Sequence, residues 1–292
     1  MENWREKMDK ALQISGKGER TREGYIRSVR MLGEFYGKLP GAVEEDELRD
    51  YFVHRKTIDK WAPNTLRIAY CGIKFFFLHV VQADWHILSI LKAEREKRLP
   101  TILSQEEVWK VLGCVNKLHN RAFLTTVYTC GLRLQEARSL EVSDIDSDRM
   151  LIHVRCGKGA RDRYVPLPED TLKLLRVYWS EHRNPRLLFP ARGQGDKLAP
   201  TSDRPMSKSS VQGALRRAVK RAGINKKRIS VHTLRHCYAT HLLETGVPLP
   251  VIQRYMGHSQ IASTMIYCHL TTKGWSDAYD IINELMKGKD NE

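Results

Sequence analysis

The sequence predicts a mainly α-helical protein with a small antiparallel β-sheet, divided into two domains. Its 292 residues are enough for two domains of about 100–200 residues each. Apolar residues recur at helical spacing along most of the chain, and only residues 151–166 have the pattern of a strand pair. The segment 92–100, KAEREKRLP, is highly charged and ends in proline. It predicts a linker between a domain at 1–91 and a domain at 101–292.

Two helices are predicted in the first domain. One has an apolar stripe over residues 25–36 and stops at Gly37. The other is expected to begin at an N-cap, Asn64, and to bury the apolar residues from 66 to 80 on one face. Beside that face a basic residue recurs every seven positions: Lys60, Arg67 and Lys74. Contact with phosphates and simple solvation explain this basic row equally well.

The second domain is predicted to be helical apart from one hairpin. Ser104 and Glu107 form a capping box that begins a helix, and residues 121–129 form another. Strands at 151–156 and 163–166 are joined by a glycine-containing turn that carries Lys158. Further helices are expected at about 168–181, 207–222, 233–245, 248–256 and 276–288.

The charge of the chain favours a polyanionic partner. There are 49 Lys+Arg against 34 Asp+Glu, a formal net charge of +15. Ten basic residues lie between Arg204 and Arg235 without one acid, whereas a solvated helix face usually mixes both signs. The candidates for phosphate contacts in this stretch are Arg204, Lys208, Arg216, Arg217, Lys220 and Lys227.

Several function classes are disfavoured. The most apolar window, residues 73–91, is interrupted by charged and polar residues and cannot span a bilayer. A membrane-surface role is disfavoured because the sequence contains no strongly amphipathic, lysine-rich helix. The six cysteines contain no C-x-x-C pair, which argues for reduced thiols in a cytoplasmic protein. The chain also has no phosphate-binding G-x-x-x-x-G-K-[ST] loop.

Two patterns resemble metal sites but lack the necessary ligands. Residues 144–148 imitate the start of a calcium loop, but Arg149 and Arg155 stand where the glycine and the bidentate glutamate should be. His232 and His236 lie one helical turn apart, but the motif HTLRH lacks the glutamate of a zinc protease. We therefore expect no metal and no cofactor.

Six residues in a fixed order form the strongest functional pattern. They are Arg133, Lys158, His232, Arg235, His258 and Tyr267. Each has an ordinary explanation when taken alone, as a surface arginine, a turn lysine or a buried aromatic. Their combined order and spacing have no such ordinary explanation, and Glu136 adds to the pattern one helical turn after the first arginine.

The pattern resembles the tyrosine recombinases, or phage integrase family. The resemblance runs over residues 101–270 and is carried by GLRLQEARSLEVSDID, RCGKGARDRYVPL and VHTLRHCYATHLLETGVPLPVIQRYMGHSQIASTMIYCHL. It implies a helical, SAM-like core-binding domain followed by an α/β catalytic domain, as in compact Xer-like or mobile-element members. It also implies a nucleoid-associated site-specific recombinase that acts as a tetramer on double-stranded DNA.

The resemblance implies a role for each residue. Arg133 and Arg235 would bind the scissile phosphate, and Tyr267 would attack it to form a 3′-phosphotyrosyl linkage. Lys158 would protonate the leaving oxygen. His232 and His258 would be catalytic residues that hydrogen-bond the phosphate and assist proton transfer, and Glu136 would be a supporting residue that braces the site. Guanidinium groups suit this task because they offer planar, bidentate donors and stay protonated. A phenol with a pKa of about 10 needs such cations, or a base, to become a nucleophile.

Four points stay open at this stage: two other functions, the identity of the nucleophile and the place of the last helix. A type IB topoisomerase uses similar residues to relax supercoiled DNA, and a regulatory DNA-binding protein would lack one of them. Tyr238 competes with Tyr267 as the nucleophile, although its apolar helix indicates a core position. The helix at 276–288 is expected to dock either into a neighbouring protomer or onto its own domain.

Overall fold

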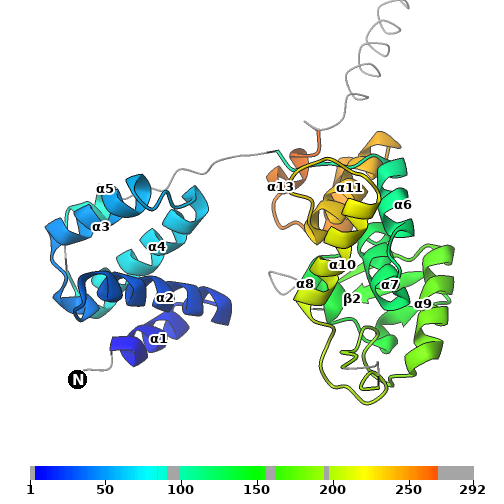
Figure 1. Cartoon of the computed structure of the whole chain (residues 1–292), viewed down its shortest axis with the longest axis horizontal. Helices are drawn as coiled ribbons and strands as arrows, with labels where there is room; N and C mark the ends of the chain where they lie inside the picture. Colours follow the sequence, from blue (N-terminus) through cyan, green and yellow to red (C-terminus); the bar gives the residue numbers. More distant parts are fainter. Residues whose placement is uncertain (1–3, 84, 91–98, 156–161, 194–196, 269–292) are drawn as a thin grey trace, which may run out of the picture. The chain divides into compact units, whose positions relative to one another are not determined.

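Two hydrophobic cores organise the chain. The computed structural model describes residues 4–83, 85–90, 99–155, 162–193 and 197–268 (Figure 1). It divides into two compact units, Met1–Arg98 and Leu99–Glu292, each with its own cluster of buried apolar side chains. The predicted fold class is confirmed, because the described residues are mostly helical with a single small antiparallel sheet.

The first unit is entirely helical in its described residues. Its α-helices are α1 (Trp4–Ile14), α2 (Glu19–Tyr36), α3 (Glu45–Thr57), α4 (Pro63–Phe76) and α5 (Ile87–Ile90). A 3₁₀ turn (Pro40–Ala42) follows α2, and a π-helical turn (Phe77–Val81) continues α4. Helices α2 and α4 cross closely because Gly72 has no side chain: a Cβ there would lie 2.8 Å from the Cα of Tyr25.

Two local predictions for this unit need correction. Helix α4 begins with Pro63 in its first turn, so Asn64 lies inside the helix and does not cap it. Proline is favoured there because its missing N–H would be unpaired in any case. Lys60 precedes the helix, in left-handed backbone with a φ of 50°. The predicted basic row therefore extends over a loop and a helix and does not follow one helix face. By contrast, α2 ends at Gly37 as predicted.

The second unit surrounds a three-stranded sheet with helices. Its helices are α6 (Gln105–Gly113), α7 (Leu118–Thr129), α8 (Leu134–Arg138), α9 (Glu169–His182), α10 (Lys208–Arg221), α11 (Val231–Glu244), α12 (Leu249–Met256) and α13 (Ala262–Met265). The strands are β1 (Ile145–Asp146), β2 (Leu151–Val154) and β3 (Arg163–Pro166), in the order β1-β2-β3 and all antiparallel. A 3₁₀ turn, Val142–Asp144, precedes β1.

The capping box at Ser104 is present as predicted, and the hairpin of β2 and β3 is confirmed. The short strand β1 was not predicted. Helix α7 begins at Leu118, three residues before the predicted start. The predicted helix at 276–288 and most of the predicted linker lie outside the described residues.

The central helices of the second unit are α7 and α11, which pack against each other. Helix α9 packs on α7 (Figure 1). Helix α12 packs on both α11 and β3. This arrangement brings the start of α8, the middle of α11, the first residue of β3 and the end of α12 to one place. The candidate site is built there.

Candidate active site

A sharp turn between α7 and α8 places Arg133 at the site. Gly131 has a φ of 61°, and a Cβ at this position would lie 2.3 Å from the ring of Tyr238. Only glycine fits both the backbone and the space. Arg133 then takes the N-cap position of α8, and the carboxylate of Glu136 at N3 accepts from the Arg133 backbone N–H at 2.8 Å. The turn and the cap together direct the Arg133 side chain towards Glu136 and the end of α12.

Glu136 is the centre of a charge cluster. One of its carboxylate oxygens accepts from Arg133 Nη1 at 2.6 Å, and Arg163 binds both oxygens at 2.7 and 3.1 Å. Arg235 Nη1 lies 3.6 Å from the same carboxylate. Burial raises the pKa of Glu136, but the hydrogen bonds and charge of Arg163, with those of Arg133, lower it to about 2. The carboxylate is therefore ionised at neutral pH and holds three guanidinium groups around it.

Arg235 is almost fully buried in α11, at 1% exposure. Its Nη1 donates to the carbonyl of Gly131 at 2.5 Å, and its Nη2 donates to the carbonyl of Met256. Burial lowers its pKa to about 9, assisted by the charge of Arg133 and opposed by Glu136. The side chain is still charged at neutral pH. A buried cation of this kind is costly to maintain without compensating groups, and two carbonyls and one carboxylate provide them.

His258 follows α12 and contacts Arg235. Its Nε2 lies 3.3 Å from Arg235 Nη2, which can only donate, so Nε2 is the acceptor. The ring proton is therefore on Nδ1, which donates to Thr264 Oγ1 at 2.9 Å. Burial and the charges of Arg235 and Arg133 lower the pKa of His258 to about 4. The ring is neutral at physiological pH.

Tyr267 follows α13 and is buried, with 1% of its surface exposed. Its hydroxyl lies 3.1 Å from Nδ1 of His236, and its ring stacks with that of His258 at a centroid distance of 6.3 Å. Burial raises the pKa of Tyr267 to about 12, although Arg235 and Arg133 oppose this. The phenol is therefore neutral in this conformation. It lies within the electrostatic reach of both arginines.

The other predicted residues are placed as follows. His232 is exposed on the first turn of α11, with its ring 5.1 Å from that of His236. Lys158 lies outside the described residues, but the last strand pair before its turn, Val154 with Arg163, is defined. Tyr238 is buried in the core, as its apolar surroundings predict. The structure thus brings together the predicted catalytic residues that it describes, and the predicted phosphate-contact residues lie elsewhere.

Two members of the cluster were not predicted as site residues. Strand alternation puts Arg163 on the same face as the buried Val165, two residues later, but it does not identify Glu136 as the partner of Arg163. His236 was considered only as a zinc ligand. Its contact with Tyr267, 31 residues later in the chain, has no local signal. Among the described residues, no three His, Cys, Asp or Glu side chains form a metal-binding group.

The predicted phosphate-binding residues on the second unit are accessible. All six, from Arg204 to Lys227, have exposed side chains, and most lie on α10. In the first unit Lys60 is exposed, whereas Arg67 and Lys74 are half-buried on α4, and Arg67 donates to Asn64 at 3.0 Å.

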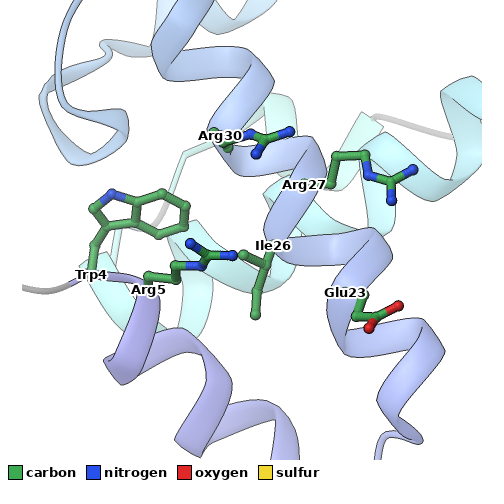
Figure 2. A pocket seen from close by; sticks show the side chains of 6 residues that line it. All are labelled: Trp4, Arg5, Glu23, Ile26, Arg27 and Arg30. Carbon is green, nitrogen blue, oxygen red and sulfur yellow. The ribbon is translucent and has the colours of Figure 1, made fainter.

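A basic pocket of about 570 Å³ lies in the first unit, between α1 and α2. Figure 2 shows the side chains that line it. They are Trp4, Arg5, Glu23, Ile26, Arg27 and Arg30. The pocket was not predicted, because its three arginines come from two helices and none stands in a charge run. It adds a second group of basic side chains to this unit.

Both units of the chain match known protein families. Residues 97–273 match the phage integrase family, and residues 4–87 match the N-terminal SAM-like domain of phage integrases. The chain is 36% identical over 269 residues to a putative integrase/recombinase, y4qK, of Sinorhizobium fredii, covering 92% of this chain and 84% of that protein. It is 31% identical over 273 residues to the tyrosine recombinase XerA of Thermococcus onnurineus, covering 92% and 91%.

Solved structures show the same fold. The XerH site-specific recombinase bound to a palindromic difH substrate, in a post-cleavage complex, matches with a TM-score of 0.71 at 19% identity, over 96% of this chain and 85% of that one. A search of the described helices finds none with the length and apolar character needed to cross a membrane. By its sequence matches over most of its length, this chain belongs to the phage integrase family and is a tyrosine-type site-specific DNA recombinase.

Proposed function

We propose that this recombinase cleaves and rejoins duplex DNA at specific sites through a 3′-phosphotyrosyl intermediate, with Tyr267 as the nucleophile. The observation that carries the proposal is the cluster of Arg133 and Arg235 beside a buried tyrosine. Three guanidinium groups surround one carboxylate there, and His258 is neutral, so the site has an excess of positive charge. Such a site suits an anion, and a phosphodiester in its transition state is a strongly charged one.

The proposed reaction proceeds in two balanced steps. Tyr267 Oη attacks the phosphorus and loses its proton to a site histidine, while the bond from phosphorus to the 5′ oxygen breaks. Lys158 gives a proton to that oxygen, so the products are a phosphotyrosine at the 3′ end and a free 5′-hydroxyl. Attack by a 5′-hydroxyl from the partner duplex reverses these steps. The tyrosyl ester is a phosphodiester, like the bond that was broken. The free energy of that bond is therefore retained, and the second step needs no external energy source.

The buried tyrosine adds one requirement. Because Tyr267 is 1% exposed and its hydroxyl contacts His236, its side chain has to leave the interior before it reaches a phosphate. The short helix α13, only four residues long, is the element that has to move with it. We infer that DNA binding provides this change, because the phosphate that Tyr267 has to reach is present only in the complex.

The exposed basic residues are proposed to hold the duplex. Arg204, Lys208 and the basic face of α10 would contact the DNA backbone from the second unit. Lys60 and the arginines of the pocket in Figure 2 would do so from the first. Four protomers on two recombining sites would then exchange strands in pairs through a Holliday junction. The tail after residue 275 is proposed to link neighbouring protomers.

The test is a covalent capture from a duplex library with a randomised core interrupted by one nick. Cleavage next to the nick releases a short fragment, so religation fails and the protein stays attached to DNA through a denaturing wash. Wild type should retain a restricted set of sequences. Tyr267→Phe should retain none, and Tyr238→Phe, which alters another buried tyrosine of the same unit, should behave as wild type.

Two results would contradict the proposal: covalent capture by Tyr267→Phe, or loss of capture by Tyr238→Phe alone. Capture of every sequence equally, together with relaxation of plasmids that lack the selected site, would instead indicate a topoisomerase.

A further inference from the structure

We propose that Arg163 is a positioning residue for DNA cleavage, which fixes the carboxylate of Glu136 and, through it, the guanidinium of Arg133. The inference rests on the proposed function. Arg163 is the first residue of β3 and is 8% exposed, so a bound duplex has little access to it. It acts on the reaction through its neighbours.

The contacts of Arg163 are those of a fixed clamp. Its two Nη atoms bind the two oxygens of Glu136 at 3.1 and 2.7 Å, and its Nε donates to the carbonyl of Tyr255 at 2.8 Å. A planar guanidinium can make these three bonds at once, and an ammonium group cannot. Glu136 is thereby held in one orientation, with one oxygen available to Arg133 Nη1 at 2.6 Å.

The same side chain determines the path of the segment that leads to His258. Gly257 has a φ of 59°, and a Cβ there would lie 2.9–3.0 Å from three atoms of Arg163. The carbonyl of Gly257 accepts from Arg133 Nη2 at 3.0 Å. Arg133, Glu136, Arg163 and Gly257 thus form a closed ring, and removing Arg163 opens it on two sides.

The position of Arg163 in the sheet extends this role. It pairs with Val154 in the last described pair of β2 and β3, and Lys158 follows Val154 by four residues in the sequence. The side chain that orients Glu136 therefore also anchors the base of that hairpin to α8 and α12. Arg163 thus connects the hairpin, α8 and α12, and the proposed reaction needs all three in fixed relative positions.

The test uses the nicked duplex recovered from the library, and measures the rate of covalent complex formation in a single turnover with protein in excess. We expect Arg163→Met and Arg163→Lys to slow this step by about 10²-fold, the size of effect seen when a preorganised donor is lost. DNA affinity, measured in the Tyr267→Phe background, should change less than about twofold, because Arg163 is buried. Arg163→Lys serves as the second variant if Arg163→Met does not fold.

Arg155→Met is the matched control. Arg155 follows β2 in the same hairpin and pairs with the buried Asp144 at 2.6 Å, but it does not contact Glu136. The Arg155→Met variant should therefore cleave DNA at the wild-type rate. Equal slowing by Arg155→Met and Arg163→Met would show that any disturbance of the hairpin suffices, and would overturn the proposal.

Two further readouts separate positioning from packing. The double variant Glu136→Gln with Arg163→Met should cleave less than about threefold more slowly than Glu136→Gln alone, because both changes break the same network of contacts. In a pH profile of the rate of covalent complex formation, Arg163→Met should also show a decrease below pH 7 that wild type does not show. The ionisable groups facing Glu136 besides Arg163 are Arg133, Arg235 and His232. Loss of Arg163 also removes a positive charge that lowers the pKa of His258, so the new limb is assigned to Glu136 only if it disappears when Glu136→Gln is also present.

A wild-type rate for Arg163→Lys, or fully multiplicative effects with Glu136→Gln, would refute the role of Arg163. These outcomes differ from failure of the proposed function, in which wild type itself forms no Tyr267-dependent complex.

Discussion

Replacing Glu136 by glutamine tests the charge cluster independently of DNA. The substitution keeps the size of the side chain and removes its charge, leaving Arg133, Arg163 and Arg235 without a counterion. The pKa of Glu136 is about 2 in the folded protein, against an ordinary value of 4.5. Each pKa unit corresponds to about 1.4 kcal/mol, so the ionised carboxylate contributes about 3 kcal/mol to the free energy of unfolding at pH 7. Removing one partner of a buried ion pair costs a similar amount, about 3–5 kcal/mol.

The pH dependence of this contribution has a definite sign. Because the folded pKa of Glu136 lies below the unfolded value, the stabilisation is complete above about pH 4.5 and is lost as the pH falls through about 2. The difference between wild type and Glu136→Gln should therefore be constant from pH 8 to pH 5 and shrink at lower pH.

The assay is urea unfolding followed by circular dichroism, with separate transitions fitted for the two units because each has its own core. Glu107→Gln is the matched control. Glu107 is also the N3 residue of a capping box, but its ion pair is with Lys226 on the surface. A surface pair contributes at most about 1 kcal/mol. If both substitutions lowered the stability of the second unit equally, or if the Glu136 effect did not change between pH 7 and pH 3, the reasoning would be wrong.

Two more predictions concern the backbone and the DNA surface. Gly257→Ala should destabilise the second unit by about 1–2 kcal/mol in urea unfolding, because it strains a left-handed residue and displaces Arg163; an unchanged midpoint would contradict this. Replacing Arg216 and Arg217 by glutamine should make the slope of log Kd against log salt shallower by about 0.9 for each lost phosphate contact. The rate of covalent complex formation at saturating protein should not change, and an unaltered slope would remove α10 from the interface.

Sequence reasoning worked where the determinants are local. The cap at Ser104 and the position of Glu136 one turn after Arg133 depend on residues within about four positions. It failed at the start of α4, where Asn64 and Pro63 are both good N-terminal signals and the proline takes the first position. Strand β1 has two residues, which is too short for any periodicity to show.

The parts of the site that could not be predicted depend on contacts between distant segments. Arg163 stands in a basic stretch, ARDRY, where a charged side chain is expected to face solvent. It points inward because its partner, Glu136, lies 27 residues earlier in the chain. His236 follows Arg235 directly, and its role depends on where α13 places the Tyr267 hydroxyl. Neither partner is visible in the local pattern.

The net charge of +15 therefore serves two physical purposes. Arg163 and Arg235 are buried and held by carbonyls and one carboxylate, so salt scarcely screens them and their geometry is fixed before any substrate arrives. Arg216 and Arg217 are exposed, and the gain they offer a phosphate depends on counterion release. Raising the salt concentration should accordingly weaken the initial binding of DNA and leave an already formed covalent complex intact. Under the proposed function, the number of exposed cations would determine how tightly the duplex is held, and the arrangement of the buried ones would determine how the scissile phosphate reacts.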